Sequence, residues 1–142
     1  MLAALREGAS QLAGLLAPLG LTPAQAEVLT VLDRAGSPLS VREIGDLLVC
    51  ERSSPSRLVN AMVDYGLLQL RKDGADARVS LVSLTRTGRQ RAKDVAEAEQ
   101  QLHSALRSSV GRADLAGAVR ALRGIVAGTP SGDALERRAE QP

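Results

Sequence analysis

The stretch that decides the fold is residues 40–63, which read SVREIGDLLVCERSSPSRLVNAMV. Ser40 is followed three residues later by Glu43, which is the spacing of a helix capping box, and Thr22 with Gln25 has the same spacing at the start of an earlier predicted helix. The apolar residues after Ser40 recur at helical spacing and predict a short helix that does not pass Cys50; they are Val41, Ile44, Leu47 and Leu48. A second short helix follows at once, so this stretch predicts two helices joined by a tight connection.

The second of these helices has a clear apolar stripe and an ambiguous start. A serine at 53 or 54 can cap it with Pro55 just inside, or the helix can begin near Arg52. Gly66 ends the helix as a predicted left-handed cap. The residues of its stripe are Leu58, Val59, Met62 and Val63.

Two short strands are predicted directly after this pair of helices, over residues 67–70 and 78–84. The Asp73-Gly74 step in the segment between them favours a turn, so the strands form a two-stranded hairpin. Two short helices followed by a β-hairpin are the element order of a winged helix-turn-helix, in which the second helix enters the DNA major groove.

Apolar residues also recur at helical spacing over residues 2–17, from Thr85 to about Ser109 and again after Gly111, so helices flank this lobe. The expected fold is mainly α with a small β-hairpin. The Leu/Ala faces of the flanking helices exceed what a lobe of about 65 residues can bury, so we expect an intertwined homodimer. The polar tail has no periodicity and is expected to be disordered. The expected parts are an N-terminal dimerisation helix (1–20), the DNA-binding lobe (21–88), C-terminal dimerisation helices (89–127) and the tail (128–142).

The composition excludes several classes of protein. Ala and Leu supply 45 of 142 residues, and Tyr65 is the sole aromatic residue, which disfavours an all-β fold. One cysteine, Cys50, and one histidine, His103, leave no disulfide and no Cys/His cluster for zinc. The sequence shows neither a membrane span nor a signal peptide, so we expect a cytoplasmic protein. A net charge of +2 permits a polyanionic partner without requiring one.

The non-core positions of the second short helix carry side chains suited to DNA. Arginine pairs with guanine N7 and O6, asparagine with adenine N6 and N7, and serine with phosphates or base edges. A polar, solvated helix face is the plain alternative, and the hairpin with its charges favours the DNA interpretation. The predicted contacts of this helix are Arg52, Ser53, Ser54, Ser56, Arg57 and Asn60, with Ser40 and Arg42 as predicted phosphate contacts.

The hairpin carries the most specific motif in the chain. Arg71, then Asp76-Ala77-Arg78, then Leu84-Thr85 and Gly88 have the spacing Arg…Asp-x-Arg…Leu-Thr-x-x-Gly. With this motif, the region from Leu21 to Gly88 resembles the multiple-antibiotic-resistance regulator (MarR) family. The other matching stretches are Leu21-Thr22 with Val28-Leu29, Glu43-Ile44 with Leu47-Leu48, and Ser56-Arg57-Leu58-Val59 with Gly66-Leu67.

An arginine at the hairpin tip can enter the minor groove, whose negative potential attracts it. We expect Asp76 to orient the guanidinium of Arg78 by charge-assisted hydrogen bonding. The alternative is an exposed turn pair worth under about 1 kcal/mol. Many family members carry a second arginine where Leu70 stands, so base preference does not transfer from them. The predicted wing contacts are Arg71, Lys72, Asp76 and Arg78.

The resemblance implies a dimeric transcriptional regulator, a repressor, that binds pseudo-palindromic double-stranded operator DNA. The alternative is a winged-helix module that binds protein and has no specific DNA site. The family's cleft between arms and lobe implies an unidentified small-molecule effector, although aromatic walls for it are scarce. No catalytic set, metal-ligand spacing or cofactor motif is expected. Cys50 is expected to be buried and structural, with a redox-sensing thiol as the alternative.

Overall fold

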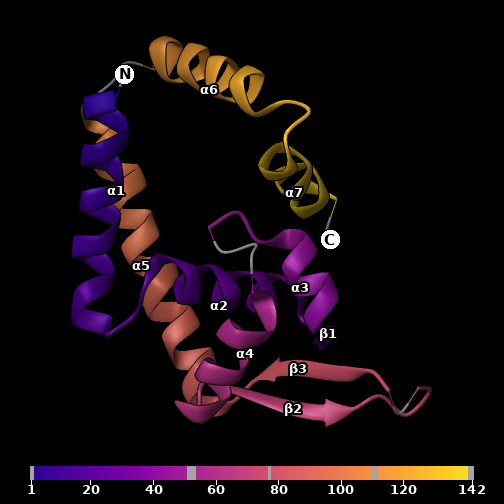
Figure 1. The fold of residues 1–142 in the computed structure, drawn as a ribbon. Coiled ribbons are helices and arrows are strands. Elements are labelled where there is room, and N and C mark those ends of the chain that lie inside the picture. Colours follow the sequence, from indigo (N-terminus) through magenta and orange to yellow (C-terminus); the bar gives the residue numbers. More distant parts are fainter. Residues whose placement is uncertain (1, 51–53, 77, 110–111, 141–142) are drawn as a thin grey trace.

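The computed structural model describes residues 2–50, 54–76, 78–109 and 112–140 (Figure 1). It is mainly helical with a small antiparallel sheet, as predicted. The helices are α1 (Leu2–Leu16), the 3-10 turn η1 (Ala17–Leu19), α2 (Pro23–Ala35), α3 (Val41–Leu47), α4 (Pro55–Asp64), α5 (Arg86–Ser109), α6 (Arg112–Val126) and α7 (Pro130–Ala139). The strands are β1 (Leu39–Ser40), β2 (Leu68–Lys72) and β3 (Ser80–Leu84).

One hydrophobic core joins α2, α3, α4 and the sheet, with the end of α1 and the first half of α5 packed against it. Burying each large apolar side chain contributes about 1.5–3 kcal/mol, so this core supplies the main stabilisation of the lobe. The larger side chains with no exposed surface are Leu16, Val28, Leu29, Ile44, Leu48, Val59, Met62, Val82 and Val95.

Both predicted capping boxes are present, and they fix where α2 and α3 begin. At α2, the Thr22 hydroxyl accepts from the Gln25 N–H (3.3 Å), and the Thr22 N–H donates to Gln25 Oε1 (2.9 Å). At α3, the Ser40 hydroxyl accepts from the Glu43 N–H (3.2 Å), and the Ser40 N–H donates to the Glu43 carboxylate (2.7 Å). Hydrogen bonding to Ser40 lowers the pKa of the Glu43 carboxyl below its ordinary value.

The sheet has three strands, one more than the predicted two-stranded hairpin. The sheet has the order β1-β3-β2, and β1 pairs antiparallel with β3 through Leu39 opposite Val82 and Ser40 opposite Leu81. The hairpin register runs from Leu68 opposite Leu84 to Lys72 opposite Ser80. A strand of two residues has no alternation to detect, because the period-2 signal needs about four residues or more.

The tail predicted to be disordered instead forms α7. The Thr129 hydroxyl accepts from the Gly132 N–H (3.2 Å) and caps the helix, and Ala134 is fully buried. α7 packs on α3, so this helix is stabilised by tertiary contacts. Such contacts cannot be predicted from a short polar sequence. Figure 1 shows α1 beside α5, α6 arching away from them, and α7 returning to α3.

Thr85 and Gly88 join the hairpin to α5, which gives a structural reason for their place in the motif. The Thr85 N–H donates to the Leu67 carbonyl (3.1 Å), and the Thr85 hydroxyl accepts from the Gly88 N–H (3.0 Å). A Cβ at Gly88 would lie 2.0 Å from the Leu67 carbonyl oxygen. Only glycine therefore lets α5 approach the chain that leaves α4 this closely.

We expect Gly88→Ala to lower the free energy of unfolding by about 1–3 kcal/mol, because overpacking against a backbone carbonyl cannot be relieved by a rotamer change. Urea unfolding of the full chain measures this loss. Gly74→Ala is the matched control, since a Cβ there would have nothing within 4 Å. A Gly88→Ala protein that unfolds at the wild-type urea concentration would contradict the packing described.

Candidate nucleic-acid interface

Helix α4 has one buried face and one polar face. Val59 and Met62 are buried in the core, whereas Ser56, Arg57 and Asn60 are exposed. Residues three and four apart are neighbours on a helix, so these three polar side chains form one continuous surface, here named the α4 polar face. No acidic residue occurs from Ser54 to Val63, so the surface can approach a polyanion without like-charge repulsion.

The start of α4 agrees with one of the two predicted alternatives. Ser54 occupies the N-cap position and Pro55 is the first helical residue, but the Ser54 side chain makes no capping hydrogen bond. The Leu58 N–H donates to the Ser54 carbonyl (3.2 Å), which is the first bond of the helix. The predicted contacts Arg52 and Ser53 lie outside the described residues.

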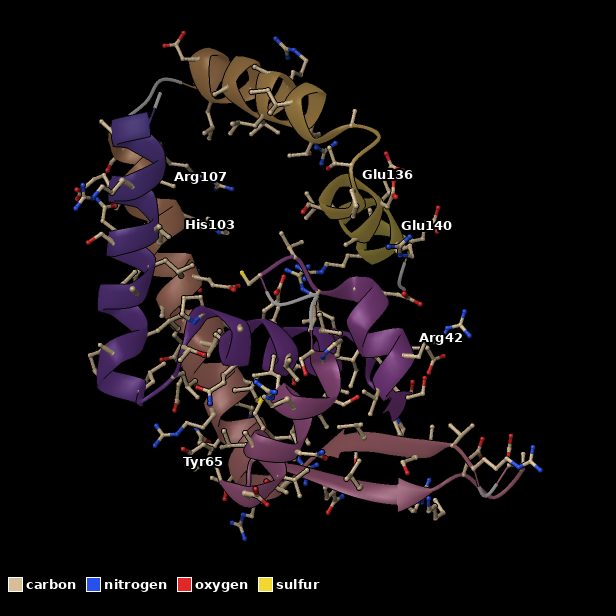
Figure 2. The ribbon with its side chains drawn as sticks, viewed as in Figure 1. Arg42, Tyr65, His103, Arg107, Glu136 and Glu140 are labelled. Atoms are coloured by element: carbon tan, nitrogen blue, oxygen red, sulfur yellow. The ribbon has the colours of Figure 1, made fainter. Side chains whose placement is uncertain are left out.

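Helices α3 and α4 meet at a close contact that sets their spacing. A Cβ on Gly45 would lie 2.8 Å from Cγ of Pro55, so glycine at this position brings the start of α4 near the middle of α3. Beside this contact is a shallow groove with Arg42 on its α3 side and Ser56 on its α4 side. The structure thus places Arg42 on a surface continuous with the α4 polar face, and Figure 2 shows its side chain pointing away from α3.

Ser40, the other predicted phosphate contact, serves the fold directly. Its hydroxyl and its backbone N–H both bond to Glu43, and the residue also pairs with Leu81 in the sheet. The side chain is half-buried at the start of α3. Its observed role is therefore to position α3.

The wing, residues 68–84, extends away from the helices (Figure 1). Arg71 and Lys72 are exposed at the outer end of β2, and Lys72 Nζ donates to the Ser80 hydroxyl (3.4 Å). Arg78 is exposed in the turn beyond them. Three cations are thus gathered on the projecting end of the hairpin.

Asp76 does not hold the Arg78 guanidinium as predicted. Its carboxylate accepts from the Arg78 backbone N–H (2.9 Å), and the Asp76 carbonyl accepts from the Val79 N–H (2.9 Å). The ion pairs among the described residues join Arg91 to Asp94 and Arg138 to Glu27. An Asp side chain readily bonds the backbone two residues on, so Asp76 shapes the turn that carries Arg78.

Sequence reasoning missed Glu27, which holds the connection between α3 and α4. Its Oε1 accepts from the Val49 N–H (2.9 Å) and its Oε2 from the Cys50 N–H (2.8 Å). The Glu27 side chain is only 8% exposed. The sequence places this carboxylate between the apolar residues Ala26 and Val28, which indicates that it is near the core. The sequence does not indicate which groups it bonds to.

Cys50 is exposed, which contradicts the prediction of a buried residue. It lies past the end of α3, where the chain has left the core. Partial burial of the thiol and the neighbouring Glu27 carboxylate raise the pKa of Cys50 above its ordinary value, while Arg138 acts in the opposite direction. The thiolate is the reactive form, so the exposed thiol is held in its less reactive state.

We therefore expect Cys50 to react with iodoacetamide at pH 8 more slowly than free cysteine. Glu27→Gln should accelerate the reaction, because removing the negative charge lowers the thiol pKa, and Arg138→Ala should slow it further. Mass spectrometry over a time course measures the three rates. If both variants accelerated the reaction, local opening rather than electrostatics would control it.

The described part of the chain has no group of three or more His, Cys, Asp or Glu side chains that could hold a metal ion. His103 is exposed and lies on the side of α5 away from α1 (Figure 2). Among the helices described, none alone is long and apolar enough to cross a membrane. The segments 6–19 and 23–35 have the length and apolar composition of a span only when they are taken together, and the chain bends by 76° between them.

Two short helices in close contact, followed by a projecting hairpin with basic side chains, define a winged helix-turn-helix protein. Residues 19–79 match the model of the MarR family. The resemblance drawn from the sequence is therefore confirmed, and residues 19–79 lie in a winged-helix lobe that matches the MarR family. No curated protein matches it closely enough to be significant.

Solved structures agree over most of the chain. BpsR of Bordetella bronchiseptica, studied for regulation of its DNA binding by 6-hydroxynicotinic acid, superposes with a TM-score of 0.77 at 21% identity, covering 89% of both chains. A cysteine-to-serine variant of Escherichia coli MarR, complexed with operator DNA, has a TM-score of 0.75 at 23% identity, covering 85% of this chain and 86% of that one. NadR in complex with 4-hydroxyphenylacetate has a TM-score of 0.70 at 18% identity, covering 89% of both. At these identities the likeness establishes the fold.

Proposed function

We propose that this chain is a cytoplasmic, homodimeric transcriptional repressor that binds pseudo-palindromic operator DNA and catalyses no reaction. Helix α4 lies in the major groove and the wing in the minor groove. The observation that carries the proposal is the α4 polar face, which is exposed, free of acidic residues and backed by a wing with Arg71, Lys72 and Arg78 at its outer end. The complex of E. coli MarR with operator DNA supports it, because that fold matches this one.

Exposed apolar side chains on the outer helices support the homodimer. Val119, Leu122 and Ile125 of α6 are 42%, 53% and 62% exposed, and Leu106 of α5 is 45% exposed. Apolar side chains gathered on a helix in this way are costly in water and mark an association surface. A twofold dimer places two copies of α4 about one DNA turn, roughly 34 Å, apart, which matches a pseudo-palindrome.

The proposal also includes a small-molecule effector of unidentified chemistry. BpsR and NadR, which share this fold, are described with 6-hydroxynicotinic acid and 4-hydroxyphenylacetate. In this chain a hollow between η1, α2 and α5 has Tyr65 and Arg91 in its lining. Tyr65 is the sole aromatic residue of the chain and is 72% exposed, so a ligand here would meet few aromatic contacts.

The rival function is a winged-helix module that binds protein through the wing or the arms. A salt titration of binding to duplex DNA separates the two. If the protein binds DNA through phosphate and base contacts, log Kd rises linearly with log salt concentration, because binding releases the counterions that are condensed on the DNA. Absence of DNA binding at low salt, from a folded protein, would favour the protein-binding module.

A further inference from the structure

We propose that α7 positions the recognition helix α4, through Arg137 and Arg138 at the end of α3 and through the pairing of Arg138 with Glu27. The inference rests on the proposed function and deepens it, because it assigns positioning residues for operator recognition. Two of these residues lie in the tail of the chain, beyond the family match at residues 19–79. None of the three lies on the α4 polar face.

Two arginines of α7 bond to the C-terminal end of α3. Arg137 Nε donates to the Asp46 carbonyl (3.0 Å), and Arg138 Nε donates to the Leu47 carbonyl (2.7 Å). The last carbonyls of a helix have no partner within it, and the helix dipole favours a cation at this end. The two arginines therefore cap α3 from a helix that is about 90 residues away in sequence.

Arg138 and Glu27 form a partly buried ion pair. Arg138 also donates from its NH2 group to Oε1 of Glu27, and the side chains of the two residues are 18% and 8% exposed. The same carboxylate accepts hydrogen bonds from the N–H groups of Val49 and Cys50, which follow Leu48, the C-cap residue of α3. One guanidinium and one carboxylate thus join α2, α3, α7 and the α3–α4 connection.

The α3–α4 connection links this cluster to α4. Cys50 lies only four residues before the N-cap residue Ser54, so a fixed position of Cys50 limits by chain length where α4 can begin. The contact between Gly45 and Pro55 fixes the other side of the connection. Releasing Glu27 and Arg138 would leave α4 attached to the core by its apolar stripe but with a less defined N-terminus, the end that meets the bases.

α7 is held in place by a buried side chain and by a close-packed corner with α6. Ala134 is fully buried, and a Cβ on Gly132 would lie 2.1 Å from the Val126 carbonyl oxygen at the end of α6. Thr129 bonds on both sides of this corner, donating its N–H to Val126 (3.0 Å) and accepting from Gly132 (3.2 Å). The corner between α6 and α7 is therefore tight, and the arginines are presented from a fixed support.

The test separates positioning from charge and from stability. The probes are a duplex enriched by the wild-type protein from a random-sequence library and a shuffled duplex of the same length and composition. Kd for both is measured with the full-length wild type, Arg138→Ala, Arg138→Lys, Glu27→Gln, the double variant Glu27→Gln/Arg138→Ala, and Arg123→Ala, at a temperature where each is folded by circular dichroism. Arg123→Ala removes one exposed charge from α6 and leaves the cluster intact.

We expect Arg138→Ala to weaken binding to the enriched duplex by roughly 10- to 100-fold, the range for losing hydrogen bonds to a charged group. Binding to the shuffled duplex should stay near the wild-type value, because it needs charge rather than a defined α4. Arg138→Lys keeps the charge but lacks the guanidinium that bonds to both Leu47 and Glu27. Its preference for the enriched duplex over the shuffled duplex should therefore fall by an intermediate amount. Losses from Arg138→Ala and Glu27→Gln should combine non-additively, and Arg123→Ala should keep the preference.

Two results contradict different claims. If the wild type enriches no sequence, the proposed operator binding is wrong. If the wild type enriches a sequence and the Arg138 variants keep its full preference over the shuffled duplex, the positioning role of α7 is wrong while operator binding stands. A fall of equal factor for both duplexes would also contradict positioning, since loss of folded protein acts on both alike.

Discussion

We expect Ile125→Glu to convert the protein to a monomer and to lower its operator affinity by roughly 10²- to 10⁴-fold, the gain that linking two binding sites provides. Ile125 is 62% exposed on α6, beside Leu122 and Val119. A buried, unpaired carboxylate at the proposed interface is strongly unfavourable, whereas in the separated monomer it is solvated. Sedimentation equilibrium gives the mass, and titration of an enriched duplex gives the affinity.

The matched control is Arg120→Glu. Arg120 is exposed on α6, and its position two residues before Leu122 and five before Ile125 places it on the other side of the helix from this patch, since successive residues are about 100° apart. The same charge there should leave both mass and affinity unchanged. A wild-type protein that sediments as a folded monomer of 14.9 kDa at micromolar concentration would contradict the proposed dimer.

The second large effect is expected at the α4 polar face. Arg57→Ala should cost on the order of 1 to 3 kcal/mol per half-site and relax the preference at one base position, provided that its guanidinium meets a base edge. Arg57 is exposed and lies outside the core, so the melting temperature should hardly change. Competition between single-base variants of the enriched duplex measures the preference.

Arg78→Ala is the counterpart on the wing and should differ in kind. Arg78 follows minor-groove shape in the proposed complex, so its loss should weaken binding evenly across sequences and lower the salt slope by about one per half-site. Asp76→Ala should act in the same direction by loosening the turn that presents Arg78. Unchanged affinity in both arginine variants, with native melting, would contradict the assignment of this surface to DNA.

The sequence was sufficient for the elements with a strong local signal. Thr22 with Gln25 and Ser40 with Glu43 predicted the starts of α2 and α3, because a capping box is complete within four residues. Apolar spacing predicted α5 and α6, and the wing motif predicted the family. Exposure of Ser56, Arg57 and Asn60 followed from helical phase once the core stripe of α4 was known.

What the sequence could not show depends on contacts between distant segments. β1 is too short for a pattern and exists because Leu39 meets Val82. α7 has a polar sequence, and its order depends on packing against α3 and on Arg138, which is 111 residues from its partner Glu27. Cys50 was placed in the core by its apolar neighbours, but the chain turns outward after Leu48, so burial ends there.

The roles of Asp76 and Ser40 show a related difficulty. Both residues can bond either to a partner's charge or to the nearby backbone, and residue type does not decide between these uses. In the folded chain both bond to local backbone groups, to the Arg78 N–H in one case and to the Glu43 N–H in the other. In the proposed complex with DNA, both residues therefore act through the turn and the helix that they shape.

The most direct test of operator reading through α4 is selection of a bound duplex from a random-sequence library by the full-length protein. We expect the wild-type protein to enrich a pseudo-palindrome whose half-site centres lie about one helical turn apart, and Arg57→Ala to lose the preference at one position in each half-site. A folded wild-type protein that enriches no sequence, or an Arg57→Ala variant that enriches the identical sequence with equal strength, would contradict operator reading through α4.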